Sequence, residues 1–461
     1  MTIRRSLCLG LCLGIGLTAM TPEPLQATPV KREILRKIGP RGSSGRSKND
    51  LIEFGRKLFF EETFDGNGRT CGTCHPATNN FTIDPAFIRK LPRRDPLFVA
   101  EFNPELKGLE NPALMRKFGL ILENLDGFDR PGVMRGVPHN LALKTNTTSN
   151  LPGRAHAIGW SGDGAPGEGS IRFFSLGAVV QHFPKSLGRE EGVDFRIPTD
   201  AELDALEAFM VSLGRQKDID LASMTFTDKV VQTGKLLFNG EEGVNRACSA
   251  CHINGGGNRA DGVNANFDTG TRLIAMGGPP DGGFGADPQQ GVAGFGDGSM
   301  NSPSLIEAAD TPPFFHNNSA NSLEDAIRFY TTATFGNSAA GQFGGAFSLD
   351  KNGINAVGAL LRTLSAMENI RNGNVLSDQA RRTAQTSAAS DRIREAIAET
   401  NDAIEVLTRG PVKLYPASVK DLQQALKLEQ QALRTSARLI RNALLGRASR
   451  LKQDASALMI N

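Results

Sequence analysis

The chain has 461 residues, a length that allows two or three domains with cores of their own. Its formal net charge is only +3, which gives no indication of a nucleic-acid partner. The six cysteines are more informative, because four of them belong to Cys-x-x-Cys-His units.

Residues 1–27 have the pattern of a secretory signal peptide. Two arginines precede a short apolar run, and a small-residue cleavage site ends the segment. The run is too short to span a bilayer. We therefore expect export to the periplasm and loss of Cys8 and Cys12 with the signal.

Two motifs, CGTCH at 71–75 and CSACH at 248–252, have the spacing at which two thiols attach one haem and the adjacent histidine ligates its iron. A redox-active dithiol and half of a zinc site use the same Cys-x-x-Cys spacing. No third cysteine pair completes a zinc site, and both motifs follow polar or Gly-rich loops. The sequence thus predicts two covalently bound haem c groups. The attachment residues would be Cys71, Cys74, Cys248 and Cys251, with His75 and His252 as proximal iron ligands.

The segments around the two motifs repeat each other. FGRKLFFEETFDGNGRTCGTCH and TGKLLFNGEEGVNRACSACH both run from a helix with a Leu-Phe pair, through a loop, into the motif. A capped helix closes each half, at 198–214 and at 348–367. Strand patterning is nearly absent, so the chain is predicted to be all-α, with two loop-rich cytochrome c-like haem domains at 45–216 and 225–372.

The composition changes over residues 378–461, where glycine nearly vanishes and Ala, Leu, Gln and Arg dominate. Apolar residues at helical spacing on both sides of RGPVKLYP predict a helical hairpin as a C-terminal extension. Its second helix carries an excess of Lys and Arg, which could make peripheral contact with an anionic membrane. We favour packing on the haem domains with a solvated basic face.

The segment MNSPSLIEAADTPPFFHNNSANSLEDAIRFY at 300–330, together with the duplicated motifs, resembles the bacterial dihaem cytochrome c peroxidases and their relative MauG. In ordinary family peroxidases the residue matching Tyr330 is a Met that ligates the second haem, and MauG-like members carry Tyr there. The resemblance therefore implies Tyr330 as an axial ligand, whose phenolate would stabilise ferric iron. If Tyr330 only packs, Met276 or Met300 would be the ligand.

The resemblance also implies roles near the first haem. The family relays electrons between its haems through a Trp followed by Asp-Gly, which matches Trp160 in WSGDG. Ordinary members block the first iron with a second His, but no His lies between His75 and His139. An open first haem is implied, unless His139, His156 or Met134 reaches the iron by another path.

The acid–base Glu of the family has no counterpart in IRFFSLGAVVQHFPKSLGREEG. His182 is the nearest group that titrates close to neutral pH, and Glu190 or Glu191 could fold back from the loop. The family commonly holds a calcium ion between its haems, which makes calcium a further candidate cofactor.

These features together predict an exported dihaem c-type oxidoreductase of the peroxidase type. It would react with hydrogen peroxide at the first haem and store oxidising equivalents on a second haem ligated by His252 and Tyr330. A redox-protein donor or a protein substrate would then be oxidised. Two alternatives stay open: a dihaem electron-transfer protein without peroxide turnover, and an ordinary cytochrome c peroxidase with a Met-ligated second haem.

Overall fold

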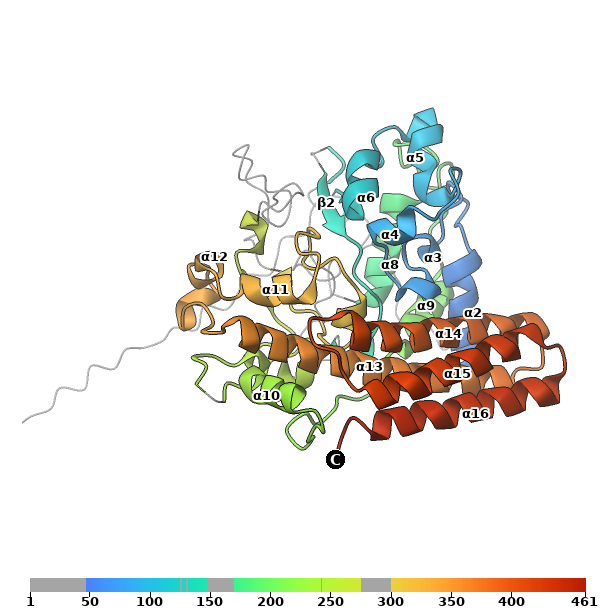
Figure 1. The fold of residues 1–461 in the computed structure, drawn as a ribbon. Coiled ribbons are helices and arrows are strands. Elements are labelled where there is room, and N and C mark those ends of the chain that lie inside the picture. The colour runs from blue at the N-terminus through green and yellow to red at the C-terminus, as the bar shows by residue number, and fades with distance from the viewer. Residues whose placement is uncertain (1–46, 125–126, 130–131, 147–169, 242, 275–299) are drawn as a thin grey trace, which may run out of the picture.

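The computed structural model describes residues 47–124, 127–129, 132–146, 170–241, 243–274 and 300–461 (Figure 1). The predicted signal peptide, Trp160, His156 and Met276 lie outside these residues. Helices dominate the described chain, which confirms the all-α prediction. The described strands form two short antiparallel pairs, β1 (Leu120–Glu123) with β2 (Val133–Gly136) and β3 (Asn266–Phe267) with β4 (Met300–Asn301).

The first half of the chain consists mainly of short helices joined by loops. Its α-helices are α2 (Lys48–Glu61), α3 (Cys71–Cys74), α4 (Pro85–Ile88), α5 (Val99–Phe102), α6 (Pro112–Phe118), α7 (Leu143–Asn146), α8 (Ile171–His182) and α9 (Asp200–Ser212). The three longest, α2, α8 and α9, surround one apolar core. Helix α9 begins where the sequence predicts, because Thr199 and Glu202 form a capping box there.

The second half repeats the central helix pair of the first. Its helices are α10 (Lys229–Phe238), α11 (Leu323–Phe329), α12 (Ala333–Gly336) and α13 (Lys351–Arg382). Helix α10 packs on α13 as α2 packs on α9, and a second apolar core forms around this pair. Helix α13 continues well past the expected end of the second half at 372, so that half and the extension share one helix.

A glycine lies at the crossing point of each helix pair. A Cβ atom on Gly55 of α2 would lie 1.8 Å from the carbonyl oxygen of Ala205 on α9. A Cβ on Gly234 of α10 would lie 2.0 Å from the carbonyl oxygen of Ala356 on α13. These two glycines occupy matching places in the sequence repeat, FGRKLFF and TGKLLF, because only a residue without a side chain allows the backbones to approach this closely.

Adding a methyl group at either crossing should therefore weaken the fold. Gly55→Ala and Gly234→Ala are each expected to lower the free energy of unfolding by about 1–3 kcal/mol, because the helices must separate to admit the new atom. Gly446→Ala is the matched control, since the nearest atom to its added Cβ, Cζ of Arg381, is 3.9 Å away. That control should be neutral or stabilising by up to ~1 kcal/mol. Equal effects of the three substitutions in chemical denaturation would contradict the close-crossing explanation.

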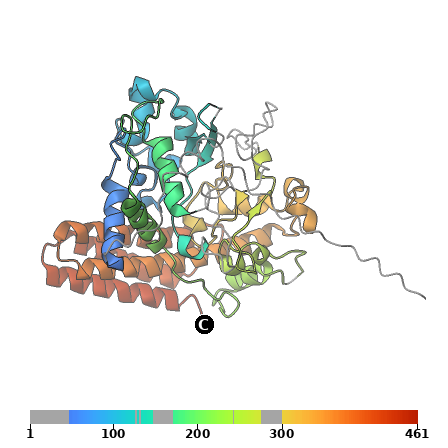
Figure 2. The ribbon, with the colours of Figure 1, turned by 180° about the vertical axis from the view of Figure 1, so that it is seen from behind.

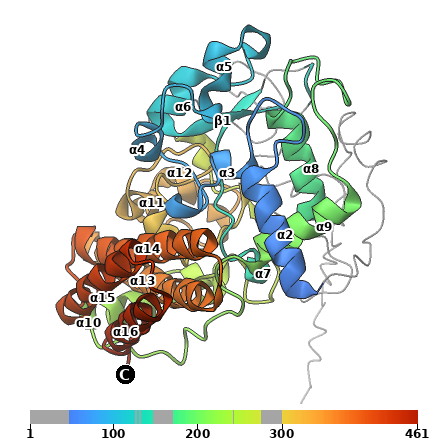
Figure 3. The same cartoon turned by 90° about the vertical axis from the view of Figure 1, so that its right-hand side faces the viewer.

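The C-terminal extension completes a four-helix bundle. Its helices are α14 (Thr386–Arg409), α15 (Pro416–Arg434) and α16 (Arg438–Ala457). Helix α13 packs on α14 and α16, and α15 packs on the same two helices from the other side. Figure 3 shows these four helices grouped together beside the first half.

The extension thus has three helices where the sequence predicted the two of a hairpin. The missed boundary lies between Arg434 and Arg438, where the chain contains neither Gly nor Pro. The side chain of Thr435 accepts a hydrogen bond from the backbone N–H of Ala437 at 3.3 Å. This local bond competes with helical pairing and lets α16 fold back along α15.

Helix α14 connects the extension to the first half of the chain. Arg392 on α14 forms an ion pair with Glu53 on α2 at 2.7 Å, and Arg56 on α2 pairs with Glu395 on α14. Views from the front and from behind both show α2 reaching the bundle (Figures 1 and 2). The bundle therefore contacts both halves and ties them together.

Carboxyl groups gather where α14 meets both halves. Asn80 of the first half donates from Nδ2 to Oδ2 of Asp402 on α14 at 3.2 Å and to the carbonyl oxygen of Asp310 at 3.1 Å. Asn369 on α13 donates to Oδ2 of Asp310 at 2.6 Å. Burial, followed by the nearby Asp402, raises the pKa of Asp310 to about 8, and burial raises the pKa of Asp402 to about 6. Burial likewise raises the pKa of Glu399 well above its ordinary range.

These raised values predict that stability falls as the pH rises. The folded protein holds protons that the unfolded chain releases near the ordinary carboxyl pKa of 3.8, so the contribution is complete at acid pH and is lost as the pH passes through about 6 to 8. The melting temperature measured across this range should decrease. Asp402→Asn removes one of the charges and should flatten the decrease, whereas a melting temperature that rises equally in both proteins would contradict the assignment.

The basic residues of the last two helices are divided between surface and interior. Lys452 is fully buried in an ion pair with Glu429 at 2.6 Å, and Arg441 is buried as well. Arg434, Arg438 and Arg447 are exposed. No helix in the described part of the chain is both long and apolar enough to cross a membrane.

Candidate haem sites

The first Cys-x-x-Cys-His motif forms a single helical turn. Helix α3 spans the two cysteines and begins with a capping box between Thr70 and Thr73. The N–H of His75 closes the turn by donating to the carbonyl oxygen of Cys71 at 3.0 Å. Because residues three apart lie on one face of a helix, this turn brings the thiols of Cys71 and Cys74 to the same side.

A backbone carbonyl determines which nitrogen of His75 is available. Nδ1 lies 2.7 Å from the carbonyl oxygen of Phe81, an atom that can only accept a hydrogen bond. The proton is therefore on Nδ1, and the lone pair is on Nε2. Burial lowers the pKa of His75 to about 4, which keeps the ring neutral. Neutral imidazole with a free Nε2 is the form that binds iron.

The thiols lack the properties of a redox or zinc site. The described cysteines are not joined in disulfides. Burial raises the pKa of Cys71, Cys74 and Cys248 to about 12, whereas reactive dithiols have lowered values. Within the described ranges, no three His, Cys, Asp or Glu residues are grouped so as to hold a metal ion. Covalent attachment of haem, by contrast, does not need a thiol with a lowered pKa, and it does not need a third cysteine or another clustered metal ligand.

Acidic and basic side chains collect beside the first motif. Nε2 of His182, at the end of α8, lies 3.1 Å from Oε1 of Glu123, which ends β1. Nδ1 of His182 lies 3.9 Å from Oε1 of Glu110, and Arg69 holds that same oxygen at 2.8 Å. The charge of His182 acts on the pKa of His75, and the charges of Glu110 and Glu123 act on that of Cys74. The structure thus brings a His–carboxylate pair to the first motif.

Sequence reasoning selected His182 and missed Glu123, which comes from a different element 59 positions earlier. No local pattern around Glu123 indicates its pairing, because β1 is a short strand in an otherwise loop-rich segment. The alternatives Glu190 and Glu191 are exposed on their loop. Met134, another alternative near the first haem, is buried in β2.

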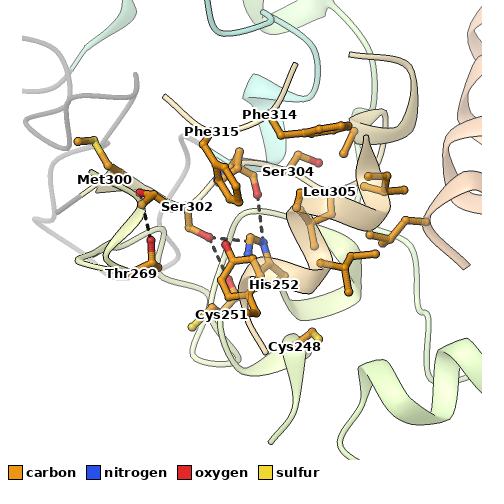
Figure 4. A pocket seen from close by; sticks show the side chains of 18 of the residues that line it. Cys248, Cys251, His252, Thr269, Met300, Ser302, Ser304, Leu305, Phe314 and Phe315 are labelled. Atoms are coloured by element: carbon orange, nitrogen blue, oxygen red, sulfur yellow. Dashed lines mark hydrogen bonds between the residues drawn. The ribbon is translucent and has the colours of Figure 1, made fainter. Parts of the chain in front are cut away.

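The second motif has the same local design as the first. A 3₁₀ turn at Cys248–Ala250 leads to Cys251 and His252. Nδ1 of His252 lies 3.0 Å from the carbonyl oxygen of Gly256 and 3.1 Å from that of Pro303, so Nε2 is again the nitrogen left free. Figure 4 shows this ring between the two cysteines and Ser302. Burial lowers the pKa of His252 below its ordinary value.

A large, mostly apolar pocket opens over His252. The empty space in it, open solvent included, is about 1660 Å³. Cys248, Cys251 and Tyr330 line the same pocket. The first half contributes part of the wall, through Thr82, Ile83, Val137 and His139. The pocket therefore lies where the two halves meet, and it suits a large, flat, apolar cofactor.

Tyr330 enters this pocket from the end of α11. Four phenylalanines surround its ring, at centroid distances between 5.0 and 6.3 Å: Phe315, Phe329, Phe335 and Phe347. Burial, and then the charges of Cys251 and Cys248, raise the pKa of Tyr330. Without a cation the phenol therefore keeps its proton, and only a strong positive charge such as iron would stabilise the phenolate.

Other potential ligands share the pocket with Tyr330. Met300, the alternative within the described residues, lines it from β4, but its sulfur points away from His252 in Figure 4. His316 and His139 also line the pocket. From the sequence, His139 was considered only as a ligand of the first haem. The structure places it in the wall of the pocket over His252, at the second motif.

The residues present fit haem c at both motifs. Each motif presents paired thiols and an imidazole whose donor nitrogen is occupied by a carbonyl, and the second adds an apolar pocket with a phenol in its lining. Bound haem would supply the redox-active iron, and the protein would supply its ligands and surroundings.

The chain matches no protein-family model. No curated protein matches it either. Among solved structures it is similar to a MauG-like protein associated with microbial copper homeostasis, with 16% sequence identity and a TM-score of 0.43. The alignment covers 74% of this chain and 93% of that chain. At this identity and TM-score the similarity alone assigns neither a family nor an activity, so function has to be inferred from the residues of the sites.

Proposed function

We propose that the protein is an exported dihaem c-type oxidoreductase of the peroxidase type, which uses hydrogen peroxide to oxidise a donor or a protein substrate. The observation that carries the proposal is the duplicated Cys-x-x-Cys-His turn in which both histidines keep Nε2 free. Haem iron bound there would supply the reaction with peroxide and the storage of oxidising equivalents.

At the first site, the pair formed by His182 and Glu123 is the candidate for proton transfer. Cleavage of a peroxide requires a group that accepts a proton from one oxygen and returns it to the other. The 3.1 Å contact between His182 Nε2 and Glu123 Oε1 lets the pair share that proton. Arg69 holds the neighbouring Glu110 at 2.8 Å, which fixes the carboxylate next to His182 in position.

At the second site, Tyr330 would provide an anionic oxygen ligand in addition to His252, since both residues line the same pocket. A phenolate stabilises ferric and more oxidised iron better than a thioether does, so the site would hold oxidising equivalents. Four phenylalanine rings pack around the phenol ring and make its surroundings largely apolar. Trp160 would relay electrons between the two sites, and calcium stays a candidate third cofactor.

The first test compares Tyr330→Phe with the wild type after addition of stoichiometric peroxide. The ferric wild type should contain two covalent haems, one of them six-coordinate and low-spin by EPR. Tyr330→Phe should lose that low-spin signal and the absorption change that peroxide produces. Tyr415→Phe is the matched control, since the chain has only two tyrosines and Tyr415 is buried in the core shared with the extension.

The same spectra separate the alternative functions. Two six-coordinate low-spin haems that do not react with peroxide would replace the proposal with an electron-transfer protein. An unchanged ligand field in Tyr330→Phe would reduce Tyr330 to a packing residue and favour a Met-ligated second haem.

The proton-transfer pair is tested by Glu123→Gln, which keeps the size and the hydrogen-bonding capacity of the side chain. Loss of the carboxylate should slow the reaction with peroxide by roughly 10²-fold while leaving the ferric spectra unchanged. Glu190→Gln, on the exposed loop, should keep the wild-type rate in stopped-flow absorption. A wild-type rate in Glu123→Gln would exclude that residue from proton transfer.

A further inference from the structure

One arginine between the two halves has donors that the protein does not use. Arg215 is 2% exposed. Its Nη2 donates to Oγ1 of Thr145 at 3.0 Å and pairs with Oδ1 of Asp218 at 3.1 Å. Among the residues that the structure describes, its Nε and Nη1 have no hydrogen-bond partner. Buried N–H groups without a partner are rare in native proteins and point to a bound group that completes them.

The charge of Arg215 is also incompletely balanced. The side chain of Asp218 is 36% exposed, so solvent weakens its pairing with the guanidinium. The buried Glu307 is close enough for its charge to interact with that of Arg215. Burial, followed by the charges of Glu368 and Asp310, raises the pKa of Glu307 well above its ordinary range, which favours the neutral form of this carboxyl. A further anion would stabilise a buried guanidinium whose one printed ion-pair partner is partly exposed to solvent.

Arg215 lies beside a residue that orients the second candidate iron ligand, His252. Its Nη2 lies 3.3 Å from where a Cβ of Gly256 would be, and the carbonyl of Gly256 holds the ring of His252. The charge of Arg215 also acts on His139, which lines the second pocket, and the charge of His75 acts on the same ring. Arg215 and His139 thus both lie near the second motif, and the charge of His75 in the first motif also reaches His139.

His139, in the wall of the pocket over His252, has one ring N–H that can donate a hydrogen bond. Its Nδ1 accepts a hydrogen bond from the N–H of Leu141 at 3.3 Å, so the ring proton is on Nε2. The immediate lining of the second pocket is otherwise mostly apolar. The guanidinium of Arg215, beside Gly256, and the imidazole N–H of His139, in the pocket wall, are donors of a kind suited to carboxylates.

We propose that Arg215, assisted by His139, binds haem carboxylate groups at the interface between the two halves and thereby sets the reduction potential of the haem that it contacts. The inference rests on the proposed function, because it requires haem at the Cys-x-x-Cys-His motifs. Arg215 acts as a positioning residue. Its positive charge favours the reduced, less positive iron and neutralises the carboxylate that would otherwise favour the oxidised form.

The test is spectroelectrochemical titration of the purified dihaem protein and its variants. Arg215→Gln should shift the one-electron equilibrium of one haem about tenfold toward the oxidised form, a fall of ~59 mV in midpoint potential. Arg215→Lys keeps the charge and should recover most of the potential. Arg441→Met is the control, because Arg441 on α16 is also buried, at 3% exposure, and its Nε and Nη2 also lack partners. That control should leave both potentials unchanged.

Each outcome has a definite meaning. Absence of covalent haem from the wild type would overturn the proposed function and this inference with it. Two haems with unchanged potentials in Arg215→Gln would overturn the inference alone. If Arg215→Gln does not fold, Arg215→Lys decides: loss of the fork geometry should shift the propionate bending band in the resonance Raman spectrum, and an unchanged band overturns the proposal.

Discussion

Both candidate sites depend on one kind of contact, a hydrogen bond from the Nδ1 of a histidine to a backbone carbonyl. Phe81 provides the carbonyl for His75, and Gly256, with Pro303, provides it for His252. Each contact fixes the tautomer and the orientation of the ring, so that Nε2 is the nitrogen left free for a candidate iron ligand. The surrounding fold holds these carbonyl oxygens within hydrogen-bond distance of the histidine Nδ1 atoms.

In each half, one pair of packed helices supports the motif: α2 with α9 in the first half and α10 with α13 in the second. The glycine crossings at Gly55 and Gly234 allow two helix backbones to touch, which makes each pair a compact support behind its motif. Helix α13 then serves twice, as the partner of α10 and as the first helix of the C-terminal bundle. Helix α14 of the bundle contacts the first half at two places, through an ion pair with α2 and through the hydrogen bond from Asn80 to Asp402. The extension therefore helps to fix the position of the two halves relative to each other.

Features that depend on neighbouring residues were predictable. The attachment motifs, the capped helix α9 and the glycine repeat are all contiguous patterns, and the structure contains the elements they indicate. The break at Thr435 was missed, because its signal is a single side-chain hydrogen bond without Gly or Pro. Glu123 was missed for a different reason, since its partner His182 lies on another element.

The sequence by itself determined the helical class and the two Cys-x-x-Cys-His motifs, because each is written in residues close together along the chain. The candidate role of Tyr330 came from the resemblance of residues 300–330 to the dihaem peroxidases and MauG. Only the tertiary structure decided that Glu123 pairs with His182, that His139 enters the wall of the second pocket, and that Arg215 is buried with unused donors. The physical reason is that proton sharing and charge balance depend on distances between elements, which chain folding sets and local sequence patterns do not encode.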